Sequence, residues 1–348
     1  MAKLVYLALA VVLSLSASAV ARQTEPLQPA FDDESSRDQF VTPATISGPL
    51  DGENPADDWN VNGSNDWFEP ANPIEIFADP DEDCGAAPLT AAPRRMIYDT
   101  AVTATRLAPV DGFAVSDVDL RSTLIIPVFI KGSPLRLALG GGTTMISAPA
   151  SINVPSQLYN FTAELRCLIP LRETWAVDVG VGGGLFSDLS GSVGDGFRVT
   201  GRAIFIKEVN PQFKYSFGVL YLGRKNLPAM PVAGLIYTPS DDYKLELLIP
   251  RPRVMRRFAM TGSCEHWGYF GAEIFGGNTW AIQQSNGAQD TFIYKDNRII
   301  VGYEAKVPGG FAGRVEAGYV LSRQVSFTND PTTFTPGGTM MLRAGLSY

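Results

Sequence analysis

His266 is the only histidine in the sequence, so it decides whether a histidine-based hydrolase is possible. Ser263 lies three positions before it, in the run Ser263-Cys264-Glu265-His266-Trp267. A serine nucleophile must lie within hydrogen-bond reach of its base, whereas residues three apart on a β-strand point to opposite faces. We therefore expect His266 to be a loop or interface residue beside Trp267, and we expect the protein not to be an enzyme.

Patterns that could bind a metal are incomplete. Cys84, Cys167 and Cys264 are widely spaced and form no C-x-x-C motif, so they predict neither a zinc site nor a disulfide framework. The acidic run 79–83 resembles the start of a calcium-binding loop, but Thr90 stands where that loop needs its final glutamate. We expect no metal and no cofactor.

Glycine triplets and an arginine run are the remaining patterns that could bind an anion. The triplets 140–142 and 182–184 lack the lysine and the following helix of a phosphate-binding loop. Glycines in barrel strands more often allow bends or close packing. The basic run consists of Arg251, Arg253, Arg256 and Arg257, which could bind acidic lipid or face the lumen or solvent. We expect no nucleic-acid binding, because nothing else in the sequence supports it.

Charged residues also occur at alternate positions within apolar segments. Strict alternation places them on one face of a strand and the apolar residues on the other. They are the candidate lumen-facing residues of a barrel: Glu164, Arg166, Asp178, Arg202, Lys214, Arg298, Glu304, Arg314, Glu316 and Arg343. Mixed charges of this kind could line a water-filled pore, or could pair across the interior and close it. The sequence leaves both possibilities open.

The segments that carry these charges alternate with period two from about residue 97 to 348. In one of them, Phe217 and Val219 oppose Ser216 and Gly218. The repeating segments are often ten residues or longer, and aromatic residues lie near their ends, as expected for tilted membrane strands with interfacial girdles. We predict an all-β, antiparallel transmembrane barrel over 97–348 rather than a soluble sandwich.

Connection lengths predict the strand number and the placement of the termini. Short connections are expected at 131–134, 170–173, 208–212, 239–242 and 308–309, and longer ones at 148–156, 187–195, 277–289 and 326–337. Outer-membrane barrels have short periplasmic turns and longer external loops. With both termini periplasmic the count must be even. Fourteen strands fit best, and twelve remain possible because the region 227–276 is rich in proline.

The first 21 residues have the features of a secretory signal peptide. Lys3 is followed by the apolar run 4–15 and by Ala19-Val20-Ala21, which predicts cleavage before Arg22. No later stretch approaches 18 consecutive apolar residues, so no helical membrane span is expected. We expect export to the cell outer membrane, with outer-membrane lipid around the barrel.

Residues 22–96 form a separate acidic, proline-rich segment. It contains sixteen Asp or Glu residues and four Arg, a net charge of about −12. Such a composition does not bury enough apolar surface to offset the entropy of ordering, so we predict a disordered tail. Trp59, Trp67 and Phe68 are its only aromatic cluster and could dock on a partner or on the barrel.

The last strand carries the most specific signal. Met340, Leu342, Ala344, Leu346 and Tyr348 form one apolar face that ends in an aromatic residue. This arrangement resembles the signal that the barrel-assembly machinery reads in outer-membrane proteins. We expect that machinery to be a partner, and the sequence leaves the oligomeric state open.

Several short stretches resemble an uncharacterised family of bacterial outer-membrane β-barrels, a domain of unknown function. They are Tyr98-Asp99-Thr100, Leu158-Tyr159, Ser187-Asp188, Leu227-Pro228, Gly234-Leu235-Ile236-Tyr237-Thr238-Pro239, Ile249-Pro250-Arg251-Pro252, Trp280-Ala281-Ile282, and Glu316-Ala317-Gly318-Tyr319 with Arg323. The resemblance covers about 97–348 and implies a fold and a location but no activity. Two functions stay open: a passive channel for small solutes, and a structural or adhesion barrel that binds a partner through its acidic tail or external loops.

Overall fold

The structure, a computed structural model, describes residues 97–348 apart from 192, 226, 308–309 and 332. The predicted signal peptide (1–21) and the predicted acidic tail (22–96), with its run 79–83 and Cys84, lie outside the described residues. No helix within the described part is long and apolar enough to cross a membrane.

The described residues form one sheet of β-strands and a short 3-10 turn at Val193–Gly196. Two-residue turns such as Asp111-Gly112 and Lys131-Gly132 have positive φ at both positions, which suits the twist of a hairpin. The strands are β1 (Ile97–Val110), β2 (Phe113–Ile130), β3 (Ser133–Ser147), β4 (Gln157–Arg172), β5 (Trp175–Ser187), β6 (Phe197–Asn210), β7 (Phe213–Tyr221), β8 (Ala229–Ser240), β9 (Tyr243–Ile249), β10 (Arg253–Thr261), β11 (Cys264–Gln283), β12 (Gln289–Lys306), β13 (Ala312–Phe327), β14 (Thr333–Phe334) and β15 (Thr339–Ser347).

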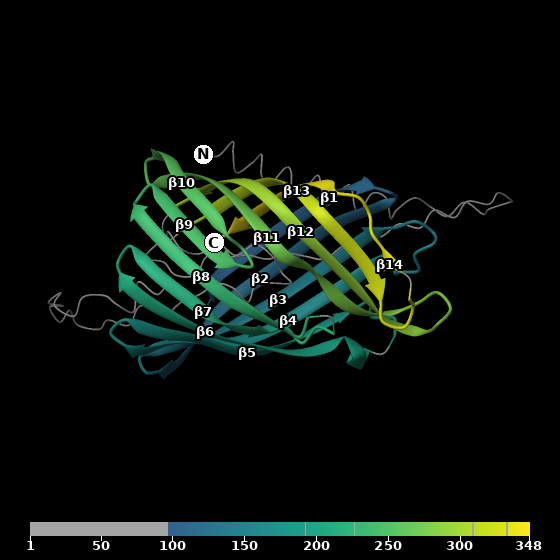
Figure 1. Cartoon of the computed structure of the whole chain (residues 1–348). Coiled ribbons are helices and arrows are strands. Elements are labelled where there is room, and N and C mark those ends of the chain that lie inside the picture. The colour runs from purple at the N-terminus through teal and green to yellow at the C-terminus, as the bar shows by residue number, and fades with distance from the viewer. Residues whose placement is uncertain (1–96, 192, 226, 308–309, 332) are drawn as a thin grey trace.

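The sheet closes on itself as an antiparallel barrel (Figure 1). Each of β1 to β13 pairs with its sequence neighbour, and β15 lies between β13 and β1. The two-residue β14 pairs with β13 outside this ring, so the barrel has fourteen strands. The predicted fold class and the preferred strand number are confirmed.

Both ends of the barrel chain lie at one rim, which we call the terminal rim. The backbone groups of Thr100 and Tyr348 exchange hydrogen bonds of 2.9 and 3.0 Å there. The connections at this rim are short, as predicted, whereas the opposite rim carries the longer ones at 148–156, 188–196, 222–228 and 328–338. The opposite rim also has two short connections, 111–112 and 250–252, that the expected pattern did not include.

The two faces of the barrel wall differ in polarity. Large apolar side chains are exposed on the outside, among them Phe217, Val219, Val301, Tyr319 and Leu342. Their strand neighbours point inward and are buried. A water-soluble sandwich would have the opposite arrangement, with its polar face outside. The exposed apolar face is therefore suited to lipid.

Strand β11 extends beyond its predicted end, whereas β12 begins close to its predicted start. The sequence predicted a loop at 277–289, but β11 continues to Gln283 and β12 begins at Gln289. The extension starts at a bulge between Glu273 and Gly276. Gly277 has φ +87 there, and a Cβ at this position would overlap the carbonyl oxygen of Tyr294. Because a bulge bends its strand, the extended hairpin leaves the line of the wall.

An arginine on the outer face should destabilise the barrel in a depth-dependent way. Val301 and Phe258 are 59% and 58% exposed, but Phe258 lies close to the β10–β11 turn at the terminal rim. We expect Val301→Arg to cost about 2–4 kcal/mol of folding free energy and Phe258→Arg about 0–1 kcal/mol. Urea unfolding of the refolded barrel in vesicles measures both values, and equal losses would contradict a lipid-facing outer wall. The inward neighbour Gly302 is no control, because a Cβ there would overlap the Tyr269 ring.

Candidate functional site: the barrel interior

The ten candidate lumen-facing residues are all buried, and they lie on the face opposite the exposed apolar residues. The set comprises Glu164, Arg166, Asp178, Arg202, Lys214, Arg298, Glu304, Arg314, Glu316 and Arg343. They lie at inward positions of β4, β5, β6, β7, β12, β13 and β15, as on β13, where Arg314 and Glu316 alternate with the exposed Val315. The barrel therefore encloses a polar interior.

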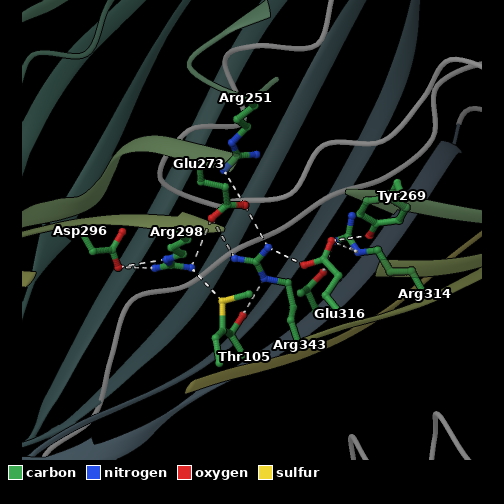
Figure 2. A network of polar contacts seen from close by, with 11 residues as sticks. Thr105, Arg251, Tyr269, Glu273, Asp296, Arg298, Arg314, Glu316 and Arg343 are labelled. Carbon is green, nitrogen blue, oxygen red and sulfur yellow. Dashed lines mark hydrogen bonds and ion pairs between the residues drawn. The ribbon is translucent and has the colours of Figure 1, made fainter. Parts of the chain in front are cut away.

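Arg343 on β15 is the centre of the largest group of contacts (Figure 2). Its Nη1 lies 2.9 Å from Glu273 Oε1 on β11 and 2.6 Å from Glu316 Oε2 on β13. Its Nε donates a hydrogen bond of 3.2 Å to Thr105 Oγ1 on β1. Since β15 and β11 are not neighbouring strands, these side chains join separate parts of the wall.

Further charges extend the same group. Arg298 Nη2 lies 2.7 Å from Asp296 Oδ2, and its Nη1 lies 3.5 Å from Glu273 Oε2. Arg251, in the connection after β9, approaches Glu273 Oε1 at 3.5 Å. The Tyr269 hydroxyl donates a hydrogen bond of 2.5 Å to Glu316. Glu273 thus contacts three guanidinium groups. We call these arginines and their partners the Arg343 network, which consists of Arg251, Arg298, Arg343, Glu273, Asp296, Glu316, Tyr269 and Thr105.

A second group of ion pairs lies on β4, β5 and β6. Asp178 accepts from Arg166 Nε at 2.9 Å and from Arg202 Nη1 at 3.0 Å. Arg202 Nε also lies 3.0 Å from Glu164 Oε1. All four side chains are at most 5% exposed. Burying charges costs several kcal/mol each unless they are paired, so this wall is stable because both signs are present.

Two further candidate residues, Lys214 and Glu304, pair with residues of a neighbouring strand or of their own strand. Lys214 Nζ lies 3.3 Å from Glu208 Oε2, and Lys306 Nζ lies 3.8 Å from Glu304 Oε1. Glu246 and Lys244, which sequence reasoning missed, join them. Glu246 lies 2.9 Å from Lys244 Nζ and 2.5 Å from Nη2 of Arg253, a member of the basic run. The interior charges of the described wall thus occur largely as ion pairs.

A large apolar cluster lies inside the barrel near the opposite rim. Wall residues and residues of the extended β11–β12 hairpin form one buried cluster, which includes Leu107, Phe113, Ile146, Leu158, Phe186, Val325 and Phe327 from the wall and connections, and Trp280, Ile282, Phe292 and Tyr294 from the hairpin. The Phe113 and Tyr294 ring centroids are 5.9 Å apart, as are those of Trp280 and Phe292.

The hairpin is attached to the far side of the barrel. Ala281 pairs in parallel with Ser187 at the end of β5, six strands away from β11. The backbone N of Gln283 donates to Asp188 Oδ2 at 2.8 Å, and the Asp188 N donates to the Ala281 carbonyl at 3.2 Å. The hairpin therefore crosses the mouth of the barrel at the opposite rim.

Two further contacts hold the hairpin from other directions. Arg198 on β6 donates to Asn278 Oδ1 at 3.2 Å and also to the Thr279 carbonyl. Lys225, in the connection after β7, donates to Thr291 Oγ1 at 2.7 Å. Burial lowers the pKa of the neighbouring Arg224 to about 10, while the Asp296 carboxylate opposes this shift. Arg224 therefore stays charged at neutral pH.

His266 lies at the terminal rim, away from these groups. Its Nδ1 is 2.7 Å from the Tyr303 hydroxyl and its Nε2 is 3.0 Å from Thr261 Oγ1. The Tyr303 ring stacks on the imidazole, with centroids 6.1 Å apart. These contacts fit the interface role expected from the sequence. Within the described ranges, no group of three or more His, Cys, Asp and Glu side chains is arranged to hold a metal ion.

Sequence reasoning missed Glu273, Asp296 and the extension of the hairpin across the mouth, although 290–306 was predicted to be a strand. Glu273 was detectable, because Tyr269, Gly271 and Glu273 continue one inward row with period two. The hairpin was not, because the run 290–294 is buried on both faces and no longer alternates. Its burial depends on the far wall, which the local sequence does not describe.

Comparison with known proteins gives a family match and distant structural similarities. The family model described as Domain of unknown function (DUF6268) matches residues 147–333. An outer membrane channel from Pseudomonas putida F1 is 10% identical with a TM-score of 0.37, over 76% of this chain and 99% of that one. The NanC porin (9%, TM-score 0.34, 72% and 98%) and LpxR from Salmonella typhimurium (7%, TM-score 0.34, 72% and 99%) are similarly distant. No curated protein matches the chain. These similarities are too low to assign an activity or a substrate.

Loss of the Arg343 side chain should be far more costly than loss of an ion pair at the rim. Arg343→Ala leaves Glu273 and Glu316 without their shortest ion pairs inside the barrel, which should destabilise the protein by about 3–5 kcal/mol. Arg257→Ala is the control, because Arg257 lies at the terminal rim and is itself 17% exposed. Of its partners Asp242 and Glu265 the first is 59% exposed, and such rim pairs contribute about 0–1 kcal/mol. The free energy of unfolding in vesicles tests this, and similar losses in both variants would contradict the structural role of the network.

Proposed function

The chain belongs to the family described as Domain of unknown function (DUF6268), and we propose that it is an outer-membrane barrel with a closed passage for small polar solutes. The observation that carries the proposal is the β11–β12 hairpin, which crosses the mouth above a polar interior and is fastened to the β5 end. A structure that covers a lumen in this way is suited to a passage that opens when the cover moves.

Placement in the outer membrane is supported by the wall itself. A closed barrel leaves no unpaired strand edge, which is the condition for crossing lipid with strands. Its outer face is apolar, and the aromatic residues Phe311 and Tyr348 lie together at the terminal rim with ring centroids 4.6 Å apart. Export through a cleaved signal peptide and assembly through the strand that ends in Tyr348 belong to the same proposal.

The choice of polar solutes rests on the chemistry of the interior. Both signs of charge line the wall, so neither anions nor cations meet a lumen of one sign. Gly180, at an inward position of β5, leaves room for the charged side chains of Glu164 and Arg202. An apolar solute would have to displace buried charges that are paired with each other, which is costly.

The hairpin has features of a movable cover. The hairpin departs from the wall at Phe275 and Gly277. Phe275 has φ +64, a backbone conformation that costs a non-glycine residue energy. Its attachment to β5 and β6 consists of a few hydrogen bonds instead of a long ladder. Burial of Trp280 and Phe292 stabilises the closed form, by about 1.5–3 kcal/mol for a large apolar side chain. We therefore expect the resting protein to conduct little.

A second function is favoured by a different observation. The Arg343 network and the ion pairs around Asp178 fill interior space with paired charges. Such an interior is also suited to a barrel that conducts nothing and acts as an anchor for the acidic segment or for the loops of the opposite rim.

Conductance in planar bilayers distinguishes the two functions. A variant lacking residues 278–292, joined by two glycines, removes the cover and should give steady single-channel steps, whereas the wild type should open rarely. The double variant Ser187→Cys and Ala281→Cys, in a Cys84→Ala background, should close the passage reversibly, because paired strand positions lie within disulfide distance. A refolded hairpin-shortened barrel that never conducts, whether residues 59–77 are present or deleted, would contradict the passage and favour the anchor.

A further inference from the structure

The inward face of β4–β8 carries an apolar surface that differs from the charged interior elsewhere. Its buried members are Leu168, Ala176, Ile204, Ile206, Leu220, Leu222, Met230 and Val232. Among the residues that the structure describes, every member of this cluster belongs to these strands or to the connection after β7. We call it the β4–β8 apolar wall.

The alternation of burial shows that this surface faces the lumen. Leu220 is fully buried, whereas its neighbours Val219 and Tyr221 are 45% and 49% exposed on the outer face. Ile204 is likewise buried beside the exposed Phe205. An apolar sheet face is stable only when another element removes it from water. The β4–β8 apolar wall therefore requires a cover inside the barrel.

We propose that residues 59–77 of the acidic N-terminal segment bind the β4–β8 apolar wall from within the lumen. This stretch contains the aromatic cluster of the segment and further large apolar residues, namely Trp59, Trp67, Phe68, Ile74, Ile76 and Phe77. It is the part of residues 22–96 that is richest in groups able to cover an apolar surface.

The attachment point of the segment lies within reach of the wall. β1 begins at Ile97 on the terminal rim, so residues 78–96 connect the proposed occupant to the barrel. Nineteen residues span up to roughly 65 Å when extended. A barrel of fourteen strands is roughly 28 Å across, as the strand spacing and tilt imply. The connection is long enough to enter the terminal rim and reach the opposite side of the lumen.

Charge also favours this occupant over a neutral or basic one. The acidic segment has a net charge of about −12, whereas residues 97–348 contain 23 Lys or Arg and 20 Asp or Glu. Arg224 is buried in the connection after β7, close in sequence to Leu222 of the apolar wall, whereas Arg202 and Lys214 already pair with Asp178 and Glu208. Carboxylates that enter with the aromatic residues therefore come close to positive charge, which lowers the electrostatic cost of their burial.

Photo-crosslinking in the full-length protein tests the proposal. A benzophenone amino acid at position 220 points inward, and the same residue at position 219 is the outward control. Trypsin cleaves the segment only at Arg22, Arg37, Arg94 and Arg95, so the occupant appears as the peptide 38–94. We expect position 220 to crosslink to this peptide within one chain, and position 219 to crosslink to lipid only.

Several outcomes would overturn the proposal. They are crosslinks from position 220 only to barrel strands, only to lipid or detergent, or only to the segment of a second, isotope-labelled copy. If the position 220 variant fails to fold, maleimide labelling of Cys84 is a second measurement that requires no substitution in the lumen. Cys84 lies in the proposed connection, whereas Cys167 and Cys264 are buried. A polar maleimide should therefore label the folded wild-type protein at Cys84. The labelling should be slow, because the proposed connection enters the lumen.

Release of the aromatic residues should raise that labelling rate. Replacing Trp59, Trp67 and Phe68 together by serine removes most of the apolar contact, and we expect the folded protein to react at least about tenfold faster. Equal rates in the wild type and in this variant would contradict the proposal. Neither measurement depends on whether the barrel conducts, so failure of this inference and failure of the proposed passage are distinguishable.

Discussion

The pairing of β1 with β15 is the constraint on which the rest of the structure depends. It joins the two ends of the chain's sheet, with Ala101 opposite Ser347 and Leu107 opposite Met341. Once the sheet is closed, no strand edge remains and every residue faces either the outside or the lumen. The apolar exterior, the polar interior and the common rim of both termini follow from this closure and from an even number of antiparallel strands.

Closure also creates the energetic problem that the interior solves. Inward side chains leave bulk water, so each charge there needs a partner of opposite sign. Glu273 shows how this is achieved, because it meets Arg343, Arg298 and Arg251 from β15, β12 and the connection after β9. The Arg343–Glu273 contact links strands that do not pair through their backbones, whereas Arg298 and Glu273 lie opposite each other on the paired strands β12 and β11. The ion pairs thereby add cross-links within the barrel that the hydrogen-bond ladder alone does not provide.

The β11–β12 hairpin departs from this simple pattern and gives the two ends of the lumen different characters. Its bulge turns both strands away from the wall, and Trp280 and Phe292 then pack with residues of the opposite side. The terminal rim has short turns and no comparable extension among the described residues. A passage through this barrel would thus be controlled at the opposite rim, whereas the terminal rim is where the acidic segment joins the chain.

From the sequence alone the barrel and the inward row of charges are predictable, and fourteen strands are preferred over twelve. A period of two is a local property, and it holds for Arg314 and Glu316 whatever surrounds them. Which charges meet was decided only by the tertiary structure, because Arg343 and Glu273 are 70 residues apart and come together through closure. The same holds for the hairpin: its residues 290–294 are buried by a far wall, so their pattern carries no period from which the local sequence could predict their place.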